Sequence, residues 1–250
     1  MPNNRSPQIG LDSNLEAGVS ISVFFPCYNE QDNVARTVEQ ALAVLNKLNA
    51  DFEVIIVDDG SSDATGRIAD EIAQRNSRVR IVRHLVNLGY GAALQSGFKA
   101  ATKEFVFYTD GDGQFDTNEM PPLLPLMERY DIVSCYRLNR RDNLIRKVNG
   151  WCWTRLVGLL FGMKIRDIDC AFKLYKRKIF DSIKLSSTGA LIDAEILARA
   201  LRKGYTLTQR PVHHYPRTAG VQTGASLRVI LRAFKELIRL HNQIRKETSK

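Results

Sequence analysis

The 250-residue chain lacks several features that would assign it to a class at once. Its four cysteines are scattered and form no CxxC pair, which argues against a zinc knuckle or a disulfide scaffold and favours reduced thiols. The N-terminus has no apolar run typical of a signal peptide, and no stretch approaches the roughly 18 apolar residues of a membrane span. We therefore expect a cytoplasmic globular protein that begins with a flexible arm over residues 1–18.

The formal net charge of +9 is concentrated in two segments. Residues 137–147 carry five basic residues and one acid, and residues 226–250 carry seven basic residues and two acids. Neither segment is accompanied by a helix-turn-helix, a zinc finger or an aromatic RNA-binding signature, so we expect no nucleic-acid partner. Such segments favour contact with phosphates or with an anionic membrane surface, while a plain solvated surface is the simpler alternative.

Short β-branched and aromatic runs alternate along the chain with segments of helical apolar spacing. Strands are expected at residues 19–25, 52–57, 79–83, 105–109, 131–135, 171–175 and 206–212. Helices are expected at residues 31–48, 64–76, 92–101, 119–129, 151–162, 193–203 and 227–246. This alternation predicts βαβ units and a mostly parallel sheet covered on both faces. We expect one α/β domain over residues 19–220 and a basic amphipathic helix within residues 221–250.

Three polar clusters follow predicted strands, namely PCYNE at 26–30, DDGS at 58–61 and DGDGQ at 110–114. Asp and Gly are common turn residues, so a single cluster of this kind would carry little information. In an open α/β sheet, however, ligands bind outside the carboxyl ends of the strands. Three such clusters therefore predict a binding site at that edge of the sheet.

The residue types in these clusters suggest what the site binds. Magnesium prefers oxygen ligands and commonly takes one or two carboxylates together with substrate phosphates. Asp110 and Asp112 flank Gly111, whose backbone freedom allows both to turn toward one ion. Asp58 and Asp59 suit hydrogen bonds from ribose hydroxyls or from the N–H edge of a base. Neither a GxGxxG after the first strand nor a GxxxxGK[ST] is present, which excludes a dinucleotide fingerprint and a P-loop.

These motifs resemble those of family 2 glycosyltransferases with the GT-A fold, and most closely the dolichyl-phosphate mannosyltransferase and polyprenyl-phosphate glycosyltransferase branch. The resemblance covers residues 21–240 and is carried by PCYNE (26–30), VDDGSSD (57–63), NLGYGAAL (87–94), YTDGDGQ (108–114) and DIDCAFKLYKR (167–177). It implies a Rossmann-like GT-A domain. It also implies inverting transfer of a hexose from a GDP- or UDP-linked sugar to a polyprenyl or dolichyl phosphate, with Mg²⁺ or Mn²⁺ as cofactor.

The resemblance also implies roles for individual residues. The donor nucleotide would be bound by Pro26, Tyr28, Glu30, Asp58, Asp59, Gly89 and Asp110. The metal would be held by Asp110, Asp112 and Gln114. The catalytic set would be Asp112, Asp169, Glu195, Arg137 and Arg217, the two arginines facing donor or acceptor phosphate. The branch usually shows a serine-lysine soon after this last arginine, whereas here Gly220 is followed by Val-Gln-Thr-Gly-Ala-Ser.

Two questions stay open on the sequence alone. An alcohol acceptor needs a general base, whereas a lipid monophosphate is already anionic at neutral pH and needs none. The candidate bases are Asp167, Asp169, Asp193 and Glu195, of which Glu195 is equally well explained as a helix-surface or sheet-edge acid. Transfer to a sugar or small-molecule hydroxyl, and a non-catalytic protein that binds nucleotide sugars, remain alternatives. The amphipathic C-terminal helix can lie on anionic lipid, or pack on its own domain or on a second copy.

Overall fold

A seven-stranded sheet forms the centre of the molecule, with strand order β3-β2-β1-β4-β6-β5-β7. The computed structural model describes residues 18–138, 144–217 and 227–247. The strands are β1 (Ser20–Cys27), β2 (Asp51–Asp58), β3 (Val79–Arg83), β4 (Phe105–Thr109), β5 (Ile132–Leu138), β6 (Phe172–Lys176) and β7 (Leu207–His213). Only β6 runs antiparallel to its neighbours, while the remaining strand pairs are parallel. The mostly parallel sheet expected from the sequence is confirmed.

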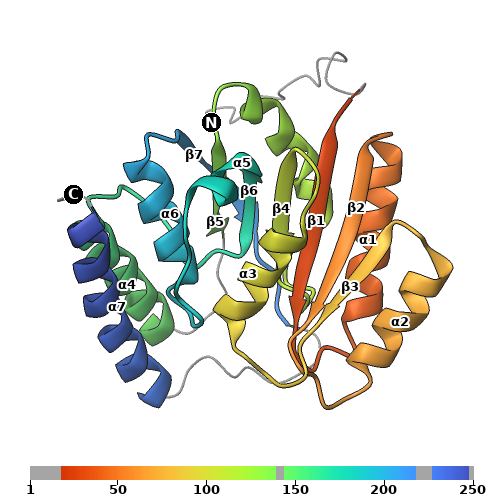
Figure 1. Cartoon of the computed structure of the whole chain (residues 1–250), viewed down its shortest axis with the longest axis horizontal. Coiled ribbons are helices and arrows are strands. Elements are labelled where there is room, and N and C mark those ends of the chain that lie inside the picture. The colour runs from red at the N-terminus through yellow and green to blue at the C-terminus, as the bar shows by residue number, and fades with distance from the viewer. Residues whose placement is uncertain (1–17, 139–143, 218–226, 248–250) are drawn as a thin grey trace, which may run out of the picture.

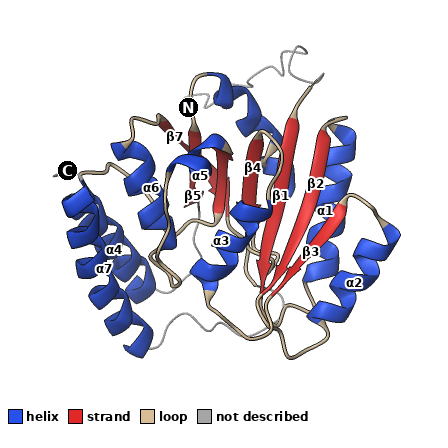
Figure 2. Cartoon of the chain, viewed as in Figure 1, coloured by secondary structure: helices blue, strands red, loops and turns tan. Residues whose placement is uncertain are grey.

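Helices cover both faces of this sheet (Figures 1 and 2). They are α1 (Val34–Lys47), α2 (Thr65–Arg75), α3 (Tyr90–Ala100), α4 (Leu144–Phe161), α5 (Lys178–Ser182), α6 (Ile192–Arg202) and α7 (Leu227–Glu247). Two short 3₁₀ helices, η1 (Thr117–Glu119) and η2 (Pro121–Glu128), lie between β4 and β5. In Figure 1, α4 and α7 lie side by side at the end of the molecule opposite β3.

The elements differ from the sequence expectations in four main places, and the first is α4, which begins at Leu144 and not at the expected residue 151. The α-helix expected over residues 119–129 is a pair of 3₁₀ helices, because Pro121, Pro122 and Pro125 supply no amide hydrogen to an α-helical ladder. The strand expected to end at Phe25 continues through Pro26, which is possible because the pairing of β1 with β4 stops at Phe24. The short helix α5 was not expected.

The core is centred on β1 and β2, whose side chains are buried on both faces of the sheet. Helix α3 approaches this core through Gly97, where a Cβ atom would lie 2.3 Å from the Phe24 ring. Phe24 in turn packs against Phe98 and Tyr108, with ring centroids 4.9 and 5.4 Å away. The glycine therefore sets how closely α3 can approach the central strand.

Gly97→Ala is expected to destabilise the protein by about 1–3 kcal/mol, since overpacking a dense core forces side chains off their rotamers. Urea unfolding of the variant measures this difference. Lys99→Ala on the exposed face of the same helix is the matched control and should shift stability by less than about 0.5 kcal/mol. Equal stabilities of the two variants would contradict the close packing described here.

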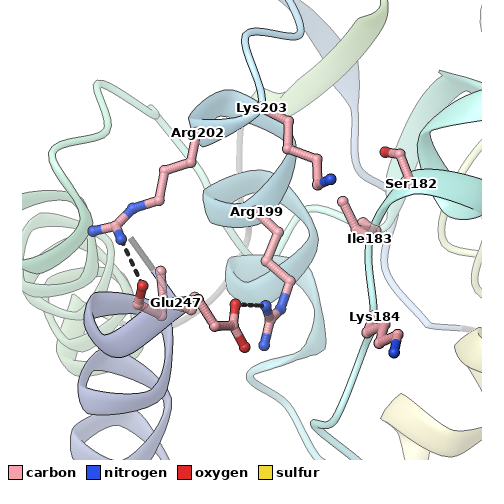
Figure 3. Close-up of a pocket in the computed structure, with 8 residues that line it drawn as sticks. Ser182, Ile183, Lys184, Arg199, Arg202, Lys203 and Glu247 are labelled. Atoms are coloured by element: carbon pink, nitrogen blue, oxygen red, sulfur yellow. Dashed lines mark hydrogen bonds and ion pairs between the residues drawn. The ribbon is translucent and has the colours of Figure 1, made fainter. Parts of the chain in front are cut away.

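The C-terminal helix α7 packs on its own domain through Leu237, Leu240 and Ile244. Figure 3 shows how its end is attached to α6: Arg199 pairs with Glu247, and Arg202 Nη1 donates to the Ile244 carbonyl at 3.0 Å. A pocket of about 390 Å³ lies beside this contact. The pocket is lined in part by residues 182–184 at the end of α5 and just after it. Helix α5 begins soon after β6 ends, and that end of β6 pairs with the start of β4. The pocket is thus at the sheet edge opposite the acidic clusters.

Candidate active site

The acidic clusters predicted from the sequence meet at one edge of the sheet. Cys27 and Asp58 are register partners at the carboxyl ends of β1 and β2, so the two loops that follow are neighbours. The loop after Thr109 leaves β4 at the same edge. Because β6 is antiparallel and Phe172 pairs with Thr109, the turn that precedes β6 also lies there. This edge is where ligands bind in open α/β sheets.

The loop after β4 packs against the end of β1 at Gly111. A Cβ atom on this residue would lie 2.5 Å from Cys27 Sγ, and its amide donates to the Pro26 carbonyl at 3.3 Å. Only glycine fits so near the neighbouring chain. The close approach places Asp110 and Asp112 on either side of this contact, at the edge of the central strands.

Asp110 carries a buried carboxylate oxygen, Oδ1, that has no hydrogen-bond partner within the described part of the chain. Burial and the charge of Asp112 raise the pKa of Asp110 to about 8, although the Tyr90 hydroxyl opposes the shift. Burial also raises the pKa of Asp112, whose Oδ1 accepts from the Gln114 amide at 3.0 Å. Both acids therefore lack a compensating charge of the strength that a divalent cation would supply.

This donor set fits a divalent cation that is shared with a substrate. Over residues 18–138, 144–217 and 227–247, no group of three or more His, Cys, Asp or Glu residues could enclose a metal. Two carboxylates completed by phosphate oxygens and water are a common magnesium arrangement. The side-chain amide of Gln114 donates to the Tyr215 carbonyl at 3.0 Å, which holds this third expected ligand at the same loop.

Arg217 reaches this loop from the segment after β7. It pairs with Glu30, and its Nη1 lies 3.9 Å from Asp112 Oδ2. The amide of Tyr215 donates to the Gln114 carbonyl at 2.9 Å, so the segment is fastened to the β4 loop. The fold thus brings together four expected site residues from the loops after β1, β4 and β7.

The turn before β6 places a second set of expected residues at the edge. Arg137 Nε and Nη2 each donate to an Asp167 oxygen at 2.7 Å in a bidentate pair. Asp169 is solvent-accessible, yet surrounding protein and the charge of Asp167 raise its pKa to about 6. A carboxyl with such a pKa is mostly ionised at neutral pH and is a stronger base than an ordinary aspartate, which suits a general base.

Asp58 and Asp59, both expected to bind the donor nucleotide, have different hydrogen-bond partners. Asp58 accepts from the Ser61 amide at 3.0 Å and from Arg83 at 3.3 Å. Asp59 accepts from the amides of Leu88 and Gly89, both at 2.9 Å, and contacts His84 Nδ1 at 2.6 Å. Asp59 therefore holds the loop after β3. Tyr28 is partly exposed beside these loops, and Pro26 lies in β1.

Gly89 lies where two loops meet. It has φ +100°, and a Cβ atom there would come 2.7 Å from the Thr188 carbonyl. The amide of neighbouring Gly91 donates to that same carbonyl at 3.0 Å. The glycines of the NLGYGAAL motif thus let the segment before α6 approach the start of α3, which the sequence alone did not predict.

The surroundings of Glu195 do not suit the catalytic role expected for it. Its side chain is fully buried, and its oxygens accept from the Ser186 and Ser187 amides, from the Ser186 hydroxyl and from Arg199 Nε. These hydrogen bonds and the ion pair lower its pKa despite burial. A carboxylate engaged in this way anchors the 186–187 segment and is poorly suited to accept a proton from an acceptor.

Residues that the sequence analysis missed lie beneath the site. Tyr108 is buried and Tyr90 half-buried next to Asp110 and Asp193, and Lys173 is buried in β6. The sequence did hold one signal for the lysine, because it interrupts the apolar strand FKLYK. A charged residue inside a strand that is buried on both faces must find internal partners.

A family model described as glycosyl transferase family 2 matches residues 22–184. The chain belongs to glycosyl transferase family 2. One relative of this chain, the dodecaprenyl-phosphate galacturonate synthase of Rhizobium johnstonii, is 34% identical over 171 residues. The alignment covers 67% of this chain and 51% of the relative, so the chain spans about half the length of that protein.

Solved structures of similar fold include other glycosyltransferases. Glucosyl-3-phosphoglycerate synthase of Mycobacterium tuberculosis in complex with UDP has a TM-score of 0.68 at 17% identity, over 92% of this chain and 81% of that one. Another crystal structure of that enzyme contains Mn²⁺, UDP and glucosyl-3-phosphoglycerate. Mannosyl-3-phosphoglycerate synthase of Rubrobacter xylanophilus has a TM-score of 0.70 at 17% identity, over 93% and 76%. The expected Rossmann-like GT-A fold is confirmed.

Proposed function

We propose that this glycosyltransferase moves a hexose from a nucleoside-diphosphate sugar to a polyprenyl phosphate, with a divalent cation at Asp110 and Asp112. The observation that carries the proposal is the buried, unpartnered Oδ1 of Asp110 beside a second carboxylate at the ligand-binding edge of the sheet. The name of the Rhizobium johnstonii relative, a dodecaprenyl-phosphate galacturonate synthase, supports a lipid-phosphate acceptor. The Mn²⁺ and UDP in the Mycobacterium tuberculosis structure support the metal and the donor class.

The reaction would be a single in-line displacement. A phosphate oxygen of the acceptor bonds to the anomeric carbon while the bond from that carbon to the diphosphate oxygen breaks, and the nucleoside diphosphate leaves. When bound, the cation supplies charge neutralisation for the departing diphosphate. Arg217 is positioned to exchange its contacts with Glu30 and Asp112 for a phosphate. A guanidinium suits this task because its planar fork matches phosphate oxygens.

A hydroxyl acceptor is the second candidate, and one observation favours it. Asp169 is accessible and has a pKa raised to about 6, so it is suited to take a proton from an alcohol. A phosphate acceptor would not need this base, because its second pKa lies near 6 and it is already anionic at neutral pH.

Asp169→Asn separates the two acceptors. With a hydroxyl acceptor, losing a general base should lower kcat by about 10²–10⁴-fold. With a phosphate acceptor, we expect a loss of less than about tenfold, because no proton has to be removed. Steady-state kinetics with both acceptor types measure the difference, and Asp181→Asn on the exposed side of α5 is the control. A large loss with polyprenyl phosphate would argue against the lipid-phosphate assignment.

A screen of nucleotide sugars tests the proposed function directly. GDP-mannose, UDP-glucose, UDP-N-acetylglucosamine and UDP-galacturonate are each incubated with a short polyprenyl phosphate, with Mn²⁺, with Mg²⁺ or with a chelator. We expect one donor to yield a lipid-linked sugar, and the chelator to stop its formation. Transfer that persists in chelator, or that occurs only to soluble hydroxyls, would overturn the proposal.

A lipid acceptor also calls for contact with a membrane, and helices α4 and α7 offer a surface for it. Within the described residues, no helix is both long enough and apolar enough to cross a bilayer. The two helices touch through Trp153 and Phe234, whose ring centroids are 5.5 Å apart. Their exposed apolar side chains are Val148, Trp151, Leu159, Phe234 and Ile238. Exposed Arg155, Arg239 and Arg245 add positive charge, which suits an anionic bilayer.

Co-sedimentation with vesicles tests the membrane surface. Binding should be strong to vesicles that contain phosphatidylglycerol, and weak to neutral ones or in high salt. Trp151→Ser with Ile238→Ser should weaken it, while Leu85→Ser, a change of a still more exposed apolar residue after β3, is the control. Equal binding by both variants would contradict the assignment of this surface.

A further inference from the structure

Lys173 is a fully buried lysine in the middle of β6, with an exposed fraction of 0%. Its Nζ lies within hydrogen-bond distance of four acceptors: Asp193 Oδ1 at 2.8 Å, the carbonyl oxygens of Cys170 and Ile168 at 2.5 and 3.2 Å, and Tyr108 Oη at 3.2 Å. The Tyr108 hydroxyl itself donates to Asp193. A buried ammonium is tolerated only where such partners surround it. One cation thus joins β6 to β4, to α6 and to the turn before β6.

Two of these segments carry residues of the proposed site. The carbonyl groups of Ile168 and Cys170 flank Asp169, and the same turn holds Asp167, which fixes Arg137 by its bidentate pair. Tyr108 precedes Asp110 by two residues at the end of β4. Lys173 is itself enclosed by protein, so it supports the site from below and contacts no solvent.

Charge balance alone does not explain this arrangement. A lysine that only neutralised Asp193 would need a single ion pair. Its other ammonium hydrogens could then be donated to any nearby acceptor. Here two of the contacts go to uncharged main-chain carbonyls on either side of Asp169. We propose that Lys173 is a positioning residue that fixes the turn carrying Asp167 and Asp169, and through it Arg137, at the same edge of the sheet as Asp110 and Asp112. The kinetic part of this inference rests on the proposed function.

The test uses a double variant. Lys173→Met alone would leave the Asp193 carboxylate buried without a counter-charge, which is strongly destabilising in any protein. Lys173→Met with Asp193→Asn removes both charges and keeps both shapes, so it separates charge balance from positioning. The matched control is Tyr175→Phe on the same strand, because its buried hydroxyl has no hydrogen-bond partner within the described residues.

Two measurements are made on each protein. We expect the double variant to fold, to keep its donor KM within about threefold, and to lose about 10–100-fold in kcat, since small misplacements of reacting groups cost this much. Amide exchange of a peptide spanning residues 166–171 should rise more than about tenfold, while β4 and α6 stay protected. Tyr175→Phe should match the wild type in both measurements.

Each outcome decides the inference. Wild-type kcat in the double variant, or unchanged exchange over residues 166–171, would show that Lys173 only balances Asp193 and would overturn the proposal. If the wild-type protein transfers no sugar, the proposed function fails, and the exchange data alone decide the role of Lys173. If the double variant does not fold, amide exchange of the 166–171 peptide in the wild-type protein decides the role of Lys173. Exchange as fast as that of an unstructured chain would overturn the proposal, and protection would support it.

Discussion

Asp112→Asn is expected to reduce sugar transfer by about 10³-fold or more, because it removes a charged ligand from the proposed metal. A bound cation supplies several kcal/mol to the transition state, and each 1.4 kcal/mol is about a factor of ten in rate. The fold itself should not suffer. Burial raises the pKa of Asp112, so its ionised form is a cost to the metal-free protein at neutral pH that the isosteric amide removes.

The measurement pairs turnover and Mn²⁺ titration with thermal unfolding. Asp116→Asn is the matched control, since it makes the same change in the same loop, where Asp116 caps η1 by accepting from the Asn118 amide at 2.9 Å. Asparagine is an equally good cap, so the control should retain both activity and stability. A variant of Asp112 that still turns over, or one that unfolds far more easily than the control, would refute the assignment.

The position of the acidic edge could be predicted from the sequence because it follows from local rules. Alternating strands and helices fix a mostly parallel sheet, and the carboxyl ends of its strands must share one edge. Asp58 ends one strand and Asp110 follows another, and both strands are recognisable by their apolar runs, so their meeting needed no tertiary information. The glycine between Asp110 and Asp112 was visible in the sequence, but the reason for it was not: a Cβ atom there would lie 2.5 Å from Cys27 Sγ.

The partners of the individual side chains could not be predicted. Arg217 and Glu30 are 187 residues apart, and nothing local indicates that they pair. Glu195 has the sequence context of an exposed or catalytic helix acid, yet it is buried and accepts from Ser187 in the segment before α6, whose course the helical pattern does not predict. The reversal of β6 has the same origin, because an antiparallel strand has the same apolar pattern as a parallel one. Tertiary contacts, which spacing does not encode, decide all three.

Lowering the pH from 8 to 6 is expected to weaken Mn²⁺ binding by about 50-fold, because binding must displace a proton from Asp110. Its pKa is raised to about 8, so the carboxyl is half protonated at pH 8 and almost fully protonated at pH 6. A metal binds only the ionised form, and the apparent affinity falls about tenfold per pH unit below the pKa. Calorimetry in two buffers of different ionisation enthalpy should report close to one proton released at pH 6.

The raised pKa of Asp110 also determines how the stability of the metal-free protein changes with pH. A carboxyl whose pKa is higher in the folded than in the unfolded protein favours folding when it is protonated, so its contribution is present at low pH and is lost as the pH rises toward 8. Metal-free protein should therefore become less stable between pH 6 and pH 8, and saturating Mn²⁺ should reverse the trend by binding the folded state. Asp110→Asn should flatten the pH dependence of the metal-free protein. A slope unchanged in that variant would place the titrating group elsewhere and would remove the electrostatic argument for a cation at this edge.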